Sequence, residues 1–250
     1  MKIVRATLFW IGFGFTTVIA TTLLTASYFL PLYIRFRIAS FWSWATLKWL
    51  KITCNLDYKV EGKENIPKGG SHVVLGNHQS TWETIACNRF FSPAVWVMKK
   101  EVLRIPVFGW GARAIQPIAI DRASGKRAVE QVKLVGIKRL KQGYFVVLFP
   151  EGTRVLPGKK TRYKVGGAVL AEAAKVSVLP FAHNAGKFWH RMQYTKTPGV
   201  VRVKIGKPID TTGLTAQEIM AKVETWVRAT EIEIAKDVEK EKQQVGQNSN

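Results

Sequence analysis

The sequence predicts an α/β protein with a largely parallel central sheet flanked by helices, preceded by an N-terminal membrane-associated helical region. Residues 1–56 contain no Asp or Glu, whereas the rest of the 250-residue chain mixes both signs of charge, as soluble domains do. Beyond Asp57, short apolar runs alternate with amphipathic stretches, a pattern typical of a parallel sheet. We therefore expect membrane-embedded and interfacial helices over residues 1–56, a globular domain over 57–242 and a disordered tail over 243–250.

The first expected helix is long enough to cross a bilayer. Residues 6–32 carry no charge and exceed the roughly 20 residues that a membrane helix needs. A cleaved signal peptide is the alternative, because small residues surround Ala26, but the apolar stretch is longer than such a peptide requires and continues past that point. If the helix spans, the more numerous cations after it place the globular domain in the cytoplasm; they are Arg35, Arg37, Lys48 and Lys51, against Lys2 and Arg5 before it.

A second helix is expected over residues 41–56. Tryptophans at 42, 44 and 49 lie there among few charges, which favours a helix at the boundary of bilayer and water. A buried helix of the soluble core is the alternative.

Six strands and four helices are expected in the globular domain. The strands occupy residues 72–76, 94–98, 114–120, 144–149, 176–181 and 200–205, and the helices occupy residues 81–89, 125–142, 166–175 and 215–239. Polar residues follow the first five strands, and they include His78, Lys100, Arg122, Arg154 and His183. Because ligands of open parallel sheets bind outside the carboxyl ends of the strands, this edge is predicted to bind an anionic substrate.

The formal net charge of +21 and the pI near 10.2 point to anionic partners. An anionic membrane surface and an anionic substrate fit the apolar N-terminus better than nucleic acid does, since the charge is spread along the chain and no nucleic-acid-binding motif occurs. We therefore expect no nucleic-acid partner. The two cysteines, Cys54 and Cys87, indicate neither a disulfide framework nor a CxxC site, and we expect no metal and no cofactor.

The segment "GNHQSTWET", residues 76–84, places His78 five residues before Glu83. A capping box of Ser80 and Glu83 at the start of a helix explains those two residues but not His78. The other interpretation is a histidine base whose tautomer is fixed by the Glu83 carboxylate. The chain contains no G-x-S-x-G nucleophile elbow, so the base would act on a hydroxyl of the substrate, and direct transfer is the simplest scheme.

The segment "FPEGTR", residues 149–154, follows a strand of buried type. A simple turn explains Pro150 and Gly152, but Glu and Arg at the ligand edge favour binding, and Arg154 can hold a phosphate through two parallel hydrogen bonds. A P-loop is excluded, because the interval from Gly152 to Gly158 is one residue longer than the G-x-x-x-x-G-K pattern allows. A dinucleotide-binding fingerprint is excluded as well, because Gly109 and Gly111 are not followed by the third glycine of that motif.

Four ordered blocks resemble those of the 1-acyl-sn-glycerol-3-phosphate acyltransferase family: "NHQSTWE", "KKEVLRIPVFGWGARAIQPIAIDR", "FPEGTR" and "VLPFAHNAG", which together span residues 77–186. The resemblance implies a glycerolipid-acyltransferase-like, membrane-bound enzyme. Such an enzyme transfers an acyl group from acyl-CoA or acyl carrier protein to lysophosphatidate and forms phosphatidate.

The resemblance also implies roles for single residues. His78 matches the family's catalytic histidine, and Glu83 stands where the family most often has aspartate. The residues that match substrate-binding positions are Lys100, Arg122, Glu151, Gly152, Thr153, Arg154 and Lys164. His183 is left out, because a histidine after a strand is more often satisfied locally. An acyltransferase for another lyso-lipid, or a non-catalytic basic membrane-anchored binding protein, remains as an alternative.

Overall fold

The computed structural model describes residues 1–69 and 71–247, and within them seven strands form one sheet in the order β1-β7-β6-β2-β5-β3-β4. Every neighbouring pair is parallel except β6 and β7, which confirms the largely parallel sheet. The strands are β1 (Leu56–Glu61), β2 (Val73–Gly76), β3 (Ala94–Lys99), β4 (Ile118–Ile120), β5 (Phe145–Leu148), β6 (Val178–His183) and β7 (Gly199–Ile205).

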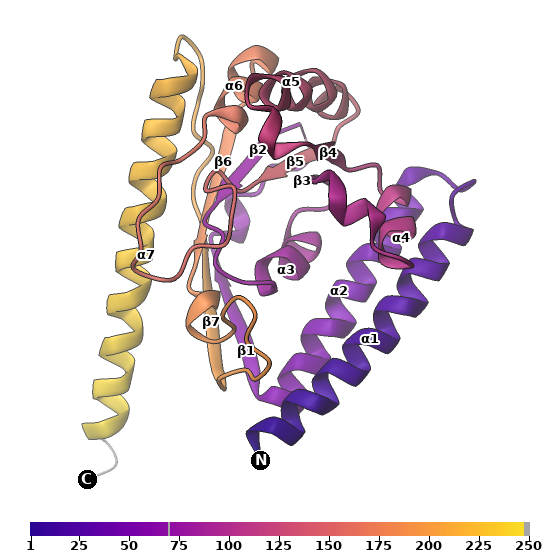
Figure 1. The fold of residues 1–250 in the computed structure, drawn as a ribbon. Helices are drawn as coiled ribbons and strands as arrows, with labels where there is room; N and C mark the ends of the chain where they lie inside the picture. The colour runs from indigo at the N-terminus through magenta and orange to yellow at the C-terminus, as the bar shows by residue number, and fades with distance from the viewer. Residues whose placement is uncertain (70, 248–250) are drawn as a thin grey trace.

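Helices cover both faces of the sheet (Figure 1). They are α1 (Lys2–Ala26), α2 (Leu32–Cys54), α3 (Trp82–Phe90), α4 (Phe108–Ala114), α5 (Lys126–Lys141), α6 (Gly166–Ala174) and α7 (Ala216–Gln247), with 3-10 turns η1 (Lys63–Asn65), η2 (Lys100–Arg104), η3 (Arg122–Ser124) and η4 (Ala185–Lys187). The helices α5, α6 and α7 pack on one side, and α3 with the α1–α2 hairpin packs on the other. Close approach of α6 requires glycine, because a Cβ at Gly167 would lie 2.6 Å from Leu75 of β2.

Most predicted elements coincide with the observed ones to within two residues. The strand predicted over 114–120 is wrong in its first half, since Ala114 ends α4 and only Ile118–Ile120 pairs with β3. The sequence also gave no expectation of β1, which pairs with β7 at the edge of the sheet. The last predicted helix continues past 239 to Gln247, whereas residues 243–250 were expected to form a disordered tail; Asn248–Asn250 lie outside the described residues.

The α1–α2 hairpin joins the core of the domain through its inner face. Phe9 and Leu24 of α1 and Leu50 of α2 belong to the same buried cluster as the strands. Both halves of α1 are tied to the domain: the indole Nε1 of Trp10 donates to the carbonyl of Tyr194 at 2.9 Å, and Gly111 of α4 lies against Thr21. The hairpin is therefore a structural part of the domain rather than a separate appendage.

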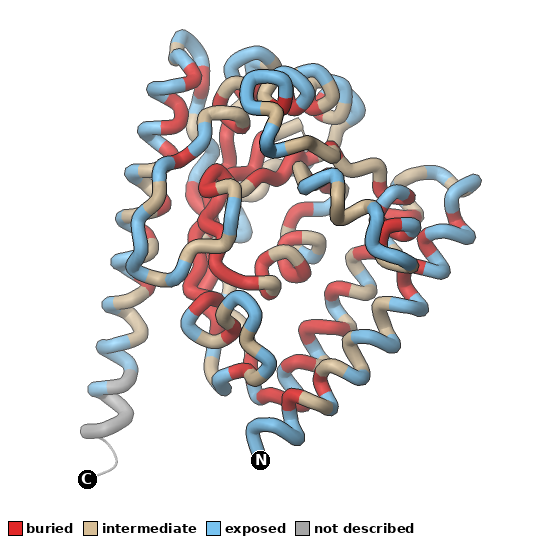
Figure 2. The backbone as a smooth tube through the Cα atoms, in the orientation of Figure 1, coloured by how far each residue is buried: buried red, intermediate tan, exposed pale blue. Residues whose placement is uncertain are grey.

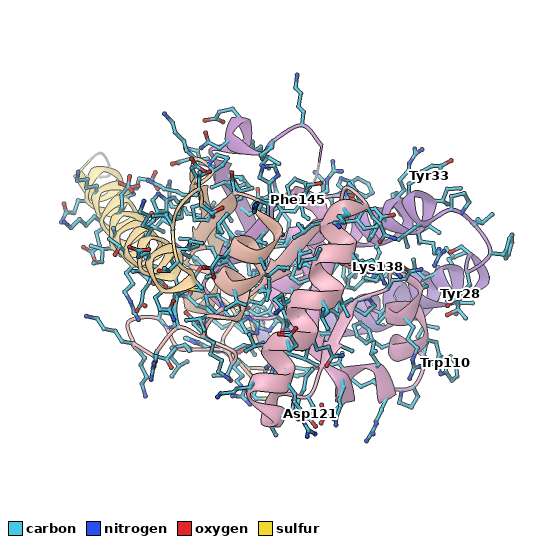
Figure 3. All side chains as sticks on the ribbon, turned by 90° about the horizontal axis from the view of Figure 1, so that it is seen from above. Tyr28, Tyr33, Trp110, Asp121, Lys138 and Phe145 are labelled. Atoms are coloured by element: carbon cyan, nitrogen blue, oxygen red, sulfur yellow. The ribbon has the colours of Figure 1, made fainter. Side chains whose placement is uncertain are left out.

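The outer face of the hairpin is apolar and exposed (Figure 2). Ile11 and Phe15 of α1 are 65% and 67% exposed, and Phe41 of α2 is 67% exposed. Tyr28, Tyr33 and Trp110 project outward near the turn of the hairpin and from the adjoining α4 (Figure 3). Within the described residues, α1 alone has the length and apolar composition to cross a membrane. The helix predicted at the interface thus forms part of α2, with one face in the core and the other exposed.

Candidate active site

His78 lies on the loop after β2, at the carboxyl edge of the parallel strands. Its backbone is held on both sides by the segment after β5: the N–H of His78 donates to Oε2 of Glu151 at 3.0 Å, and its carbonyl accepts from the N–H of Val155 at 2.7 Å. The imidazole stacks on Phe149, with ring centroids 4.3 Å apart and planes 8° from parallel. The ring is therefore fixed in orientation before any substrate arrives.

Glu83 fixes the tautomer of His78. Its Oε1 lies 2.8 Å from Nδ1 of His78, and an ionised carboxylate can only accept, so Nδ1 carries the proton and Nε2 keeps its lone pair. Burial alone would raise the pKa of Glu83, but the neighbouring His183 and the hydrogen bond from His78 together lower it. Glu83 is consequently ionised at neutral pH, which is the state that this pairing requires.

The same carboxylate oxygen also serves the start of α3. Oε1 of Glu83 accepts the backbone N–H groups of Ser80 at 2.7 Å and of Gln79 at 2.9 Å, and Oγ of Ser80 accepts the N–H of Trp82 at 3.1 Å. The histidine–carboxylate contact is therefore present, and of the capping box the half in which Glu83 reaches back to the N–H of Ser80 is present, while the Ser80 hydroxyl bonds to Trp82 instead of Glu83. The backbone donors hold the carboxylate in place, and the carboxylate holds the histidine ring.

A cavity of about 600 Å³ opens in front of His78. Its walls away from His78 are largely apolar and come from the hairpin, α3, α4 and β3, including Phe13, Leu24, Trp42, Ile85 and Ala112. The polar part of the lining includes Thr153 and Arg154 from the loop after β5 and Arg122 from η3. The structure therefore brings together a histidine, a cationic rim formed by Arg122 and Arg154, and an apolar compartment formed by the walls of the hairpin, α3, α4 and β3.

The predicted binding residues fall into two groups. Thr153, Arg154 and Arg122 line the cavity, and Arg122 donates to the carbonyl of Gly152 at 2.6 Å. Glu151 instead contacts the backbone of His78, as described above. Gly152 has φ +69°, and a Cβ there would meet Nζ of Lys164 at 2.9 Å, so Lys164 lies over this turn. Lys100 lies outside the cavity lining and pairs with Asp121 at 2.5 Å.

Three further residues belong to the site although sequence reasoning did not assign them. His183 is 1% exposed, and its Nε2 lies 3.8 Å from Oε2 of Glu83 and 3.0 Å from the carbonyl of Asn77. Lys99 and Arg191 line the cavity. Burial lowers the pKa of Arg154; the charge of Glu83 opposes this shift, and the charge of Arg191 adds to it. The position of His183 at the end of a strand could have indicated that it belongs to the site. Arg191 lies in an irregular loop, where no sequence pattern indicated a functional position.

Neither cysteine is placed to act as a nucleophile. Cys54 and Cys87 are free and buried, and burial raises the pKa of Cys87 well above its usual range. In the part of the chain that the structure describes, no group of three or more His, Cys, Asp or Glu side chains could hold a metal ion.

Comparison with known proteins shows that the chain is similar to acyltransferases in sequence and in structure. A family model described as Acyltransferase matches residues 57–184. The chain is 41% identical over 191 residues to the 1-acyl-sn-glycerol-3-phosphate acyltransferase of Pseudomonas aeruginosa, a match that covers 75% of this chain and 74% of that protein. It is 31% identical over 176 residues to the enzyme of the same name from Saccharomyces cerevisiae, covering 68% of this chain and 57% of that protein. The crystal structure of the 1-acyl-sn-glycerophosphate acyltransferase PlsC from Thermotoga maritima superposes with a TM-score of 0.78 and 26% identity, covering 94% of this chain and 96% of that one.

Proposed function

Because the chain belongs to the 1-acyl-sn-glycerol-3-phosphate acyltransferase family, and so is an enzyme that transfers an acyl group to lysophosphatidate to form phosphatidate, we propose that His78 is its general base and that transfer is direct. The observation that carries this proposal is the 2.8 Å contact of Glu83 with Nδ1 of His78, which leaves Nε2 free to accept a proton at a cationic cavity.

The proposed reaction needs no covalent enzyme intermediate. Nε2 of His78 takes the proton of the acceptor's free hydroxyl while the hydroxyl oxygen attacks the thioester carbonyl of the donor. The C–S bond then breaks, and the sulfur leaves as a thiol with the proton that the imidazolium returns. Glu83 stays ionised throughout and stabilises the imidazolium that forms between the two proton transfers.

We assign the acceptor phosphate to the cationic rim. Arg154 can hold two phosphate oxygens at once, and Arg122 and the hydroxyl of Thr153 lie on the same cavity wall. Glu151 and Gly152 would act through the shape of the loop, since Glu151 accepts the N–H of His78 and Gly152 allows the approach of Lys164. Lys164 and Lys100 would add positive charge near the rim, Lys100 less so because of its partner Asp121.

The apolar compartment would hold the acyl chain of one substrate. Its walls include Phe13 and Leu24 of α1 and Trp42 of α2, so the hairpin supplies the surface that the chain contacts. Burial of methylene groups there would stabilise the complex by about 0.8 kcal/mol each.

The enzyme is membrane-associated, and we propose that the outer face of the hairpin lies in the surface of the bilayer. The exposed apolar side chains of α1 and α2 and the outward aromatic residues suit the interface, while the ties of α1 at Trp10 and Thr21 to the domain oppose its crossing the bilayer as an isolated span. The catalytic domain would face the cytoplasm, where an acyl-CoA or acyl carrier protein donor is found, and the excess of cations would attract anionic lipid headgroups.

An acyl-transfer assay with the purified full-length chain in detergent tests the proposal. Lysophosphatidate is compared with lyso-lipids of other head groups, and acyl-CoA with acyl carrier protein, with phosphatidate formation as the measure. The enzyme is also incubated with donor alone and examined by intact mass spectrometry. We expect lysophosphatidate to be preferred and no acylated enzyme to form. A kinetically competent acyl-enzyme would overturn direct transfer, and equal rates on uncharged lyso-lipids would overturn the phosphate assignment.

A further inference from the structure

The two residues that flank His78 are both tied to one carboxylate of α7. The side-chain amide of Asn77 donates to Oε1 of Glu231 at 2.8 Å, and the side-chain amide of Gln79 donates to the same oxygen at 2.7 Å. Asn77 and Gln79 are 0% and 5% exposed. Glu231 lies on α7, 152 positions after Gln79 in the sequence, and contacts the loop that carries His78.

The remaining amide oxygens of these two side chains are also engaged. Oδ1 of Asn77 accepts the N–H of His183 at 3.0 Å, and Oε1 of Gln79 accepts the N–H of Gly186 at 3.2 Å. Together with the contacts of Glu151 and Val155 to the His78 backbone, three segments hold this loop in addition to α3, whose Glu83 accepts the N–H of Gln79. They are the start of the segment after β5, the segment from β6 to η4, and α7.

The alternation of side chains along an extended segment explains why this arrangement bears on catalysis. Residues 77 and 79 project to one side, toward α7, so residue 78 projects to the other, toward α3 and the cavity. In Figure 1, α7 and α3 lie on opposite faces of the sheet. Pinning both flanking side chains to one oxygen therefore sets the direction of the imidazole between them.

Glu231 is partly buried, and withdrawing a carboxylate from water is costly. Burial raises the pKa of Glu231, which the amide donors of Asn77 and Gln79 oppose. The helix around it holds a second active-site loop, since a guanidinium N–H of Arg228 donates to the carbonyl of Thr161 at 2.9 Å. Neither Glu231 nor Arg228 lies within the 57–184 segment that the family model matches.

We propose that Glu231 is a positioning residue, which fixes the loop of residues 77–79 so that Nε2 of His78 faces the reacting hydroxyl. This inference rests on the proposed role of His78 as the base. Misplacing a reacting group by about 1 Å can cost up to roughly 10²-fold in rate. We expect Glu231→Ala to lower kcat about tenfold and to change the KM of either substrate by less than about twofold, because the cationic rim and the acyl compartment are untouched.

The conservative variant separates positioning from charge. Glu231→Gln keeps a carbonyl oxygen that can accept both amide N–H groups, so we expect it to retain at least about a third of the wild-type kcat. Glu233→Ala is the matched control, since Glu233 lies two residues further on the same helix, is 59% exposed and pairs only with Lys204 among the residues whose side chains are described. It should behave as wild type.

The variants are assayed as full-length protein in detergent, with melting temperatures recorded and His78→Ala run alongside. A wild-type kcat in folded Glu231→Ala, or a loss expressed mainly in KM, would overturn the inference. If Glu231→Ala does not fold, Gln79→Leu carries the test because it removes one of the two ties, and an unchanged kcat there would equally overturn it. If His78→Ala itself remains active, the proposed function fails first. Loss in His78→Ala with none in Glu231→Ala contradicts only the present inference.

Discussion

The loop cluster around His78 and the α1–α2 hairpin satisfy their polar groups in opposite ways. In the cluster, hydrogen bonds join residues distant in sequence, such as Asn77 with Glu231 and His78 with Glu151. In the hairpin, threonine hydroxyls bond to carbonyls one turn back in their own helix, as Thr21 does to Thr17 at 2.8 Å and Thr53 to Trp49 at 2.7 Å. The cluster is thus specified by individual partners, and the hairpin mainly by local helix formation and apolar surface, with a few long-range bonds such as that of Trp10 to Tyr194. Single substitutions should have large kinetic effects in the first region and small, distributed effects in the second.

The largest effect is expected at His78. His78→Ala removes the proposed base and should lower kcat by about 10²- to 10⁴-fold in a protein that still folds, because the backbone bonds of the residue to Glu151 and Val155 remain. Its melting temperature should fall, since buried Glu83 loses the hydrogen bond from the ring. Steady-state rates in detergent and circular dichroism melts measure the two properties. Turnover near the wild-type rate would remove His78 from the mechanism.

A second substitution separates the two contacts that Glu83 makes. Glu83→Ala should lower kcat by about 10²-fold and also lower the melting temperature, since one oxygen serves both the histidine and the start of α3. Glu83→Asp should keep partial activity. Ser80→Ala is the control, because it should lower stability by about 0.5 to 2 kcal/mol and leave turnover nearly unchanged. Equal kinetic losses in Ser80→Ala and Glu83→Ala would mean that helix capping alone explains the pair.

Arg154→Lys sharpens the comparison within the cluster. It replaces two parallel hydrogen bonds to phosphate by a point charge, so the KM for lysophosphatidate should rise about tenfold and the KM for the donor by less than about twofold. Initial rates over a grid of both substrates give the two constants. A shift of both constants by the same factor would take Arg154 out of the acceptor site.

In the hairpin, we expect that two charged residues must be introduced together before membrane-dependent activity falls clearly. Ile11→Asp with Phe15→Asp places two carboxylates on the exposed face and should lower activity on lysophosphatidate in anionic vesicles by about fivefold, with less than about a twofold change in detergent. Leu134→Asp with Ile232→Asp is the matched control, since these side chains are 61% and 57% exposed on α5 and α7. If the control pair loses vesicle activity equally, the hairpin face has no special part in membrane binding.

The smallest effect concerns stability and pH. Burial, with the charges of Glu231 and Glu83 adding to it, raises the pKa of Glu151 to about 8 against the opposing hydrogen bond from His78. The folded state therefore holds a proton that the unfolded state releases near 4.5, and this contribution to stability is lost as the pH rises from about 4.5 through about 8. Glu151→Gln lacks that loss, so its melting temperature should gain on the wild type by a few degrees across this window. A constant difference would show that Glu151 does not titrate there.

The fold was predictable from the sequence where the pattern is local. Buried apolar runs indicated the positions of β2, β5 and β6, and the residues after β2, β4 and β5 indicated the edge that carries His78, Arg122 and Arg154. The strand β1 was missed although its sequence LDYKVE alternates apolar and charged residues, a pattern typical of a half-buried strand; it pairs with β7 far along the chain. The α4 helix was missed because its glycines, which weaken helices, are required by close contact with α1 and η2.

The site was predictable only in part for the same reason. His78 and Glu83 are close in sequence, so their spacing indicated their contact. The contacts of Glu231 with Asn77 and of His183 with Glu83 depend on how the sheet and α7 come together, and no short-range pattern encodes them. Lys100 illustrates the opposite case, since its residue type suited phosphate but its side chain pairs with Asp121.

The wall of the cavity has an evolutionary consequence. Phe13, Leu24 and Trp42 belong to the hairpin, whereas the residues proposed to carry out the reaction lie between positions 78 and 164. Substitutions at these hairpin positions can therefore change which acyl chain fits the proposed compartment without touching the residues proposed to react, while α3, α4 and β3 supply the rest of the wall.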